Sequence, residues 1–117
     1  MTNANLSALA LNPQNMITPK LTGGTYGFTL GVGSTQVLAP NPQTASVTFH
    51  NPGSVNIYVC QAFDANGNAL VPGPNPGNFM ILPGSTWTLS GNGVAGAWLA
   101  SAAEANSPFT VAVDQGS

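Results

Sequence analysis

Short runs in which apolar and polar residues alternate, each ended by turn-forming residues, constrain the fold of this chain more than any other feature. The first run extends from Thr25 to Val32 and places Tyr26, Phe28 and Leu30 on one side. A two-residue period is typical of a β-strand with one buried face. Turn-forming pairs such as Asn66-Gly67 separate the later runs, and three of the later predicted strands are Phe79–Leu82, Thr86–Ser90 and Val94–Ser101. The sequence therefore predicts about eight short strands at intervals of roughly ten residues. The predicted fold class is all-β, an antiparallel β-sandwich that is jelly-roll-like, and the choice between jelly-roll and immunoglobulin-like strand order stays open.

The clearest pair of strands lies at Ser46–Val59. Val47 and Phe49 alternate with polar residues before Asn51-Pro52-Gly53-Ser54, and a second alternating run follows at Val55–Val59. All four central residues favour turns. The pattern therefore predicts a β-hairpin whose two strands are neighbours in one sheet.

The chain divides at Gly23-Gly24, a pair of glycines that we expect to act as a flexible joint. Residues 25–117 make up the predicted β-sandwich domain, and residues 1–24 are predicted to be an extended N-terminal arm. Such an arm either folds back on its own sandwich or binds a neighbouring molecule, and we expect the second. Its large apolar side chains are the predicted partner-binding residues: Leu6, Leu9, Leu11, Met16 and Ile17.

A second predicted partner-binding segment is the loop Pro72–Gly77, which reads Pro-Gly-Pro-Asn-Pro-Gly. Because proline has no backbone N–H, this run cannot lie inside a sheet. We expect a stiff loop in which Pro72, Pro74 and Pro76 contact a partner.

Charged side chains are almost absent. They make up 3% of the residues, with one lysine and no arginine, whereas a typical soluble domain has about 25%. Binding to nucleic acid or to an anionic membrane requires several cations, so neither is an expected partner. No run of apolar residues approaches the length of a membrane span. A partner must therefore be recognised through shape, apolar area and hydrogen bonds.

Candidate catalytic groups are few and separate. Cys60 and His50 would form a nucleophile and base, but in the predicted hairpin they lie roughly 16 Å apart, against the about 3 Å that such a pair needs. The carboxylates Asp64, Glu104 and Asp114 fall in a turn, a connection and the end of a strand, so no spacing pairs them across a cleft. One histidine and one cysteine do not supply a metal site. We therefore expect no catalytic residue, no cofactor and no metal, and a protein that is not an enzyme.

Aromatic side chains offer one binding hypothesis. Tyr58, Trp87 and Trp98 could form a platform on which a sugar ring stacks. Each tryptophan, however, lies in an alternating run beside a leucine, so a position in the core or at a subunit interface is the better interpretation.

A succession of strands and turns covers most of the chain from Val32 to Val113. Its segments are Val32–Leu38, Val47–Asn51, Ile57–Val59, Ile81–Gly84 and Phe109–Val113. This succession resembles small β-proteins in the virions of tailed bacteriophages. The sequence departs from that pattern before the second segment, where Thr44-Ala45-Ser46 stands in the place of a frequent arginine. A contact that depends on the arginine is therefore not implied for this chain.

The resemblance implies a structural role in a virion. It points to a capsid decoration or cement protein on the outer capsid surface, which stabilises the head by binding across subunits of the major capsid protein. Its expected partners are the major capsid protein and further copies of itself, as a dimer or trimer. The alternative is a tail or fibre accessory protein with a host-glycan-binding surface.

Overall fold

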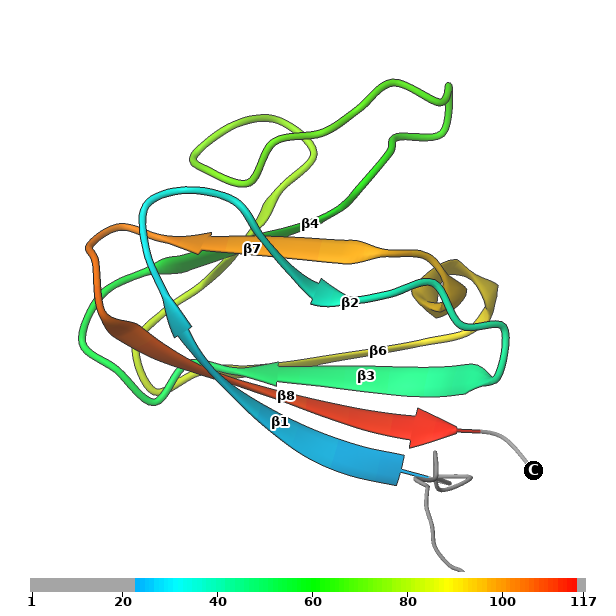
Figure 1. The fold of residues 1–117 in the computed structure, drawn as a ribbon, viewed down its shortest axis with the longest axis horizontal. Coiled ribbons are helices and arrows are strands. Elements are labelled where there is room, and N and C mark those ends of the chain that lie inside the picture. Colours follow the sequence, from blue (N-terminus) through cyan, green and yellow to red (C-terminus); the bar gives the residue numbers. More distant parts are fainter. Residues whose placement is uncertain (1–22, 116–117) are drawn as a thin grey trace, which may run out of the picture.

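The computed structural model describes residues 23–115, which form eight strands and one short 3-10 helix. The elements are β1 (Gly23–Leu30), β2 (Thr35–Leu38), β3 (Thr44–His50), β4 (Ile57–Gln61), β5 (Phe79–Ile81), β6 (Thr86–Ser90), η1 (Asn92–Ala95), β7 (Trp98–Ala102) and β8 (Ser107–Gln115). They build two four-stranded antiparallel sheets, with the strand orders β1-β8-β3-β6 and β2-β7-β4-β5 (Figure 1). The expected antiparallel β-sandwich is confirmed.

The strand order is that of a jelly roll. β1 pairs with β8, β2 with β7, β3 with β6 and β4 with β5. A jelly roll can be described as one long antiparallel ribbon of strand pairs that folds back between β4 and β5. Because this ribbon wraps around the core, successive strand pairs fall in alternate sheets. The jelly-roll order is thereby decided over the immunoglobulin-like one.

The predicted hairpin at Ser46–Val59 is wrong, because β3 and β4 belong to different sheets. The segment between them crosses from one sheet to the other, a distance of about 10 Å. The inward-facing residues of the two strands are Val47, Phe49, Ile57 and Val59, and all four are buried in the core. Alternation records only which side of each strand is buried, so it is the same for a hairpin and for a crossing between sheets.

Asn51 holds this crossing in place. Its side chain is fully buried, and its Nδ2 donates hydrogen bonds to the carbonyl oxygens of Val55 at 2.7 Å and Ile81 at 2.8 Å. Its Oδ1 accepts a hydrogen bond from the Gly53 N–H at 3.0 Å. The backbone of Asn51 also bonds to the β5–β6 turn, since its N–H donates to Ser85 and its carbonyl accepts from Gly84. One side chain therefore connects the β3–β4 crossing to the edge strand β5.

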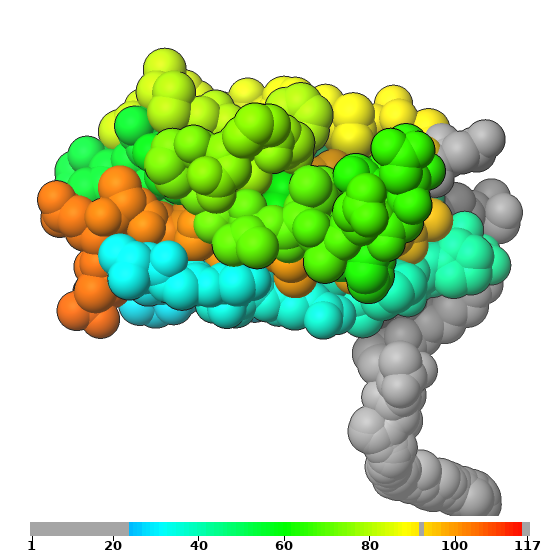
Figure 2. Space-filling view, turned by 90° about the horizontal axis from the view of Figure 1, so that it is seen from above, coloured from blue at the N-terminus to red at the C-terminus, as the bar shows by residue number. Residues whose placement is uncertain are grey.

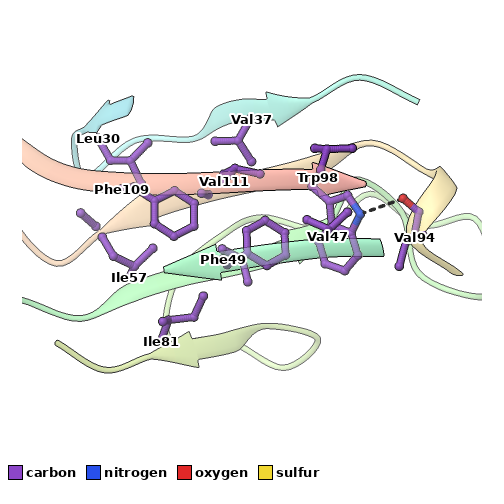
Figure 3. Close-up of a cluster of buried hydrophobic side chains, with 14 residues drawn as sticks. Leu30, Val37, Val47, Phe49, Ile57, Ile81, Val94, Trp98, Phe109 and Val111 are labelled. Carbon is purple, nitrogen blue, oxygen red and sulfur yellow. Dashed lines mark hydrogen bonds between the residues drawn. The ribbon is translucent and has the colours of Figure 1, made fainter. Parts of the chain in front are cut away.

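The core contains an aromatic cluster centred on Phe49 (Figure 3). The Phe49 ring centroid lies 5.3 Å from that of Trp98, 5.7 Å from Trp87 and 5.8 Å from Phe109. The Trp98 indole N–H donates to the carbonyl oxygen of Val94 at 3.3 Å, so its one polar atom has a partner. Together with the residues named above, these buried side chains make up the hydrophobic core: Leu30, Val37, Val47, Ile57, Val59, Ile81, Ala100, Ala102, Val111 and Val113.

The N-terminal boundary lies earlier than the sequence predicts. Gly23 and Gly24 pair with Asp114 and Val113, so they belong to β1 and do not form a joint. Glycine adopts the extended conformation of a strand as readily as other conformations, which is why the pair was ambiguous. The predicted arm residues Leu6, Leu9, Leu11, Met16 and Ile17 lie outside the described residues. Within residues 23–115, no helix is long and apolar enough to cross a membrane.

Candidate interaction surface

Exposed apolar side chains gather along one side of the sandwich, where β5 and β6 form the edges of the two sheets. Four of these side chains are between 48% and 59% exposed, and we refer to them together as the β5 patch: Phe63, Phe79, Met80 and Leu82. A contiguous apolar area on the surface of a protein marks a site of interaction.

Two hollows shape the β5 patch, and Phe79 lines both. One, of about 410 Å³, is also lined by Phe63, Leu70 and Leu89. The other, of about 280 Å³, is lined by Met80, Leu82 and Trp87. The Phe79 ring stacks on Trp87, with ring centroids 4.3 Å apart. The core aromatic cluster therefore extends through Trp87 to Phe79 at the surface, so the β5 patch lies directly on packed aromatic rings.

The surroundings of the β5 patch carry little charge. From residue 65 to residue 103 the sequence contains no acidic, basic, histidine, tyrosine or cysteine side chain. Asp64 is the carboxylate nearest to the patch in sequence, and it lines the rim of the larger hollow. Binding at this surface must therefore depend mainly on shape and apolar area.

The segment between β4 and β5 covers the outer face of the second sheet, as the green and lime atoms in Figure 2 show. Pro72 is buried there, and it lines a hollow together with Tyr58 and Ser101. Pro74 and Pro76 are exposed. Pro72 is therefore covered within this chain, whereas Pro74 and Pro76 are accessible to a partner. A contact between these prolines and a partner stays a prediction.

The outer face of the first sheet is lined with hydroxyl groups, and we refer to it as the hydroxyl face. The register of the four strands places these side chains on it: Thr25, Thr29, Ser46, Thr48, Thr86, Thr88, Ser90 and Thr110. His50 and, opposite Ser46, the carboxylate Asp114 lie on the same face. Thr48 and Thr88 share a hydrogen bond of 2.9 Å, and His50 Nδ1 bonds to the Thr86 hydroxyl at 2.9 Å. The sequence showed each polar position, but only the strand order brings them side by side.

The candidate nucleophile and base lie on different sheets. Cys60 is buried in β4 opposite Leu99 of β7, while His50 lies in β3 and bonds to Thr86. Cys60 and His50 are therefore apart because they lie in different sheets, and not because of their positions along one hairpin. Asp64 Oδ1 accepts hydrogen bonds from the N–H groups of Asn66 and Asn68, and these bonds lower the pKa of Asp64. In the described part of the chain, no three His, Cys, Asp or Glu side chains group as metal ligands would.

Burial raises the pKa of the Cys60 thiol above its ordinary value of 9.0, and this leads to a prediction about stability. The unfolded chain loses the thiol proton first as the pH rises, so the contribution of Cys60 to stability is present below pH 9.0 and is lost above it. We expect the native protein to resist a thiol reagent until it is denatured. Between about pH 8 and about pH 10, urea unfolding should show a larger loss of the free energy of unfolding for the wild type than for Cys60→Ala. Equal losses in the two proteins would contradict the prediction.

The three aromatic residues of the sugar-platform hypothesis do not meet on one surface. Trp98 is buried in the core, and Trp87 is half-buried between Phe49 and Phe79. Tyr58 lies on the opposite side of β4 from the core, facing the proline-rich loop. The interpretation of the tryptophans as core residues is confirmed for Trp98 and fits Trp87.

No protein-family model matches this sequence, and no curated protein matches it either. The class of protein is therefore defined by its fold and surface. It is a jelly-roll sandwich with a nearly uncharged apolar side and a hydroxyl-lined face.

Proposed function

We propose that this chain is a structural protein of a bacteriophage virion, a capsid decoration or cement protein. In this role it binds on the outer capsid surface across subunits of the major capsid protein and stabilises the head. It has no catalytic task, and its partners are the capsid and further copies of itself.

The observation that supports this proposal is the β5 patch with its nearly uncharged surroundings. An exposed apolar surface of this kind is a feature of proteins that assemble with others. The low charge of the chain also means that copies packed closely on a shell repel one another little. Jelly rolls occur in viral capsid proteins and in lectins, so the fold is compatible with the proposal without selecting it.

The capsid contacts are assigned to the N-terminal arm and to the exposed prolines of the β4–β5 loop. Burying a leucine-sized side chain contributes roughly 1.5–3 kcal/mol, so the arm's five large apolar residues offset part of the cost of association and of ordering the arm. Many copies on one shell would add avidity where they also contact one another.

The test uses the full chain and empty shells of the major capsid protein encoded in the same genome. We expect the wild type to sediment with the shells. A variant with serine at Leu6, Leu9, Leu11, Met16 and Ile17 should bind at least tenfold more weakly, because it loses the apolar anchors. A matched variant with serine at Asn3, Asn5, Asn12, Gln14 and Asn15 should bind like the wild type.

Two results would count against the proposal in different ways. If the wild type does not sediment with shells, the protein is not a decoration protein. If both arm variants bind equally well, the arm is not the anchor. Circular dichroism of each variant establishes that the sandwich is folded.

The alternative, a tail or fibre accessory protein that binds a host glycan, is favoured by one observation. The hydroxyl face offers many neutral hydrogen-bond donors and acceptors, which suit a polar, uncharged ligand. A glycan array probed with the full chain tests it, and binding that Thr48→Val and Thr88→Val abolish would support this alternative.

A further inference from the structure

We propose that two copies of this chain associate through the β5 patch, with β5 of one copy antiparallel to β5 of the other across a two-fold axis near Met80. The proposal concerns the protein on its own, and it stands whether or not the protein binds a capsid.

The first argument is the state of the β5 edge. β5 ends the strand order β2-β7-β4-β5, and no described strand lies on its other side. Natural proteins protect such edges with charged side chains, proline or a bulge. The segment Phe79–Leu82 has none of these, although β5 is protected in part by its length of three residues. Its register with β4 is regular, with Met80 opposite Tyr58. Part of this backbone is already bonded, since the Ile81 carbonyl accepts from Asn51 Nδ2 and the Leu82 carbonyl accepts from the Ser85 N–H. A second copy at this edge is therefore held mainly by side chains.

The second argument is area. The four side chains of the β5 patch are about half exposed, and together they offer roughly 400 Å² of apolar surface, taking about 200 Å² for a whole side chain of this size. A standard interface buries about 800 Å² on each partner, of which about 450 Å² is apolar. The patch supplies nearly the whole apolar share of a stable dimer contact.

The third argument identifies the partner as a second copy. In a two-fold contact every group near the axis meets its own counterpart, so a charge there would face a like charge. No charged residue occurs from residue 65 to residue 103, so this segment brings no like charges together at an axis near Met80. The nearest charge in sequence, Asp64, lies at the rim of the larger hollow. An apolar side chain beside its own copy is favourable.

The opposite side of the sandwich is less suited to the same contact. The hollow beside β1 and β2 is lined by Tyr26 and Val37, but also by the polar residues Asn41, Thr44 and Gln115. Tyr26 is the one large apolar side chain of β1 that is exposed. The β5 side is therefore the better candidate for self-association.

The test begins with sedimentation equilibrium of the full-length protein over a wide concentration range, where we expect a dimer. Met80→Lys and Met80→Glu should each weaken the dimer at least a hundredfold, because each places like charges face to face at the axis. An equimolar mixture of the two variants should restore association, since lysine then faces glutamate. Val32→Lys is the matched control: Val32 is 69% exposed in the β1–β2 loop and lines neither hollow of the β5 patch, and this variant should remain dimeric.

A cross-linking measurement keeps the proposal testable if a charged variant does not fold. Met80→Cys should form a disulfide-linked dimer on mild oxidation, because the two Met80 positions face each other. Val32→Cys should not, and the native Cys60 is buried and cannot compete. A wild type that is monomeric at every concentration would overturn the proposal. So would a dimer that survives both Met80 substitutions, or one that disappears only when the apolar residues of the arm are replaced by serine.

Discussion

Replacing Phe49 by alanine is expected to lower the free energy of unfolding by about 4 kcal/mol, because it removes a fully buried aromatic side chain and leaves a cavity. Phe49 is the centre of the aromatic cluster and contacts Trp87, Trp98 and Phe109. These rings come from both sheets, since Trp98 lies in β7 and the other two lie in β6 and β8. The loss therefore weakens the contact between the sheets and not only one strand.

Urea unfolding at pH 7, followed by tryptophan fluorescence, measures this effect. Val32→Ala is the control, because Val32 is 69% exposed and is not part of the β5 patch; truncation there should change stability by less than about 0.5 kcal/mol. Phe49→Leu, which keeps most of the volume, should cost about 1–2 kcal/mol and remain measurable if the alanine variant does not fold. Equal effects at Phe49 and Val32 would show that the cluster does not hold the sheets together.

Replacing Asn51 by alanine is expected to cost about 3 kcal/mol, because it leaves buried backbone groups without partners. The carbonyl oxygens of Val55 and Ile81 lose their donor, and the Gly53 N–H loses its acceptor. These groups belong to the β3–β4 crossing and to β5, so the change loosens both. Thermal unfolding of the alanine variant should show the loss as a fall in Tm of more than about 10 °C.

Asn66→Ala is the control for Asn51, since Asn66 is exposed in the Asp64–Asn68 turn and should tolerate the change. Asn51→Asp provides a second readout. Its carboxylate would be buried facing two carbonyl oxygens, so the folded state would raise the pKa of the new carboxyl group. The stability of this variant should therefore be highest at low pH and fall as the pH rises through the ordinary range of an aspartate. A variant whose stability does not depend on pH would contradict the described hydrogen bonds.

Local features of this protein follow from the sequence because they depend on neighbouring residues. The strand Thr86–Ser90 was predicted with the bounds that the structure has. The Asn66-Gly67 turn is also present, with Gly67 at a φ of 83° and the Asp64 N–H bonded to the Asn68 carbonyl. Alternation and turn preference act over a few residues, and so they determine where strands begin and end. Val94 is an exception, since it was predicted to start a strand and instead lies buried in η1.

The candidate surface was less accessible to sequence reasoning. The prolines at 74 and 76 lie in an exposed loop as expected, but Pro72 is covered by chain that returns over the sheet. Phe79 and Met80 read as ordinary core residues of an apolar strand, and they are exposed only because β5 ends its sheet. The long uncharged stretch from residue 65 to residue 103 was the signal that could have indicated this side.

The sequence by itself determined an all-β chain of short strands, their approximate bounds and an almost uncharged surface. Only the tertiary structure decided which strands are neighbours. β3 pairs with β6 and β8 and not with β4, because the six residues between β3 and β4 cross from one sheet to the other. Asn51, at the start of this crossing, bonds to β5. Strand pairing is a contact between residues far apart in the chain, and many pairings satisfy the same alternation. The jelly-roll order, the hydroxyl face and the open β5 edge all follow from that choice of neighbours.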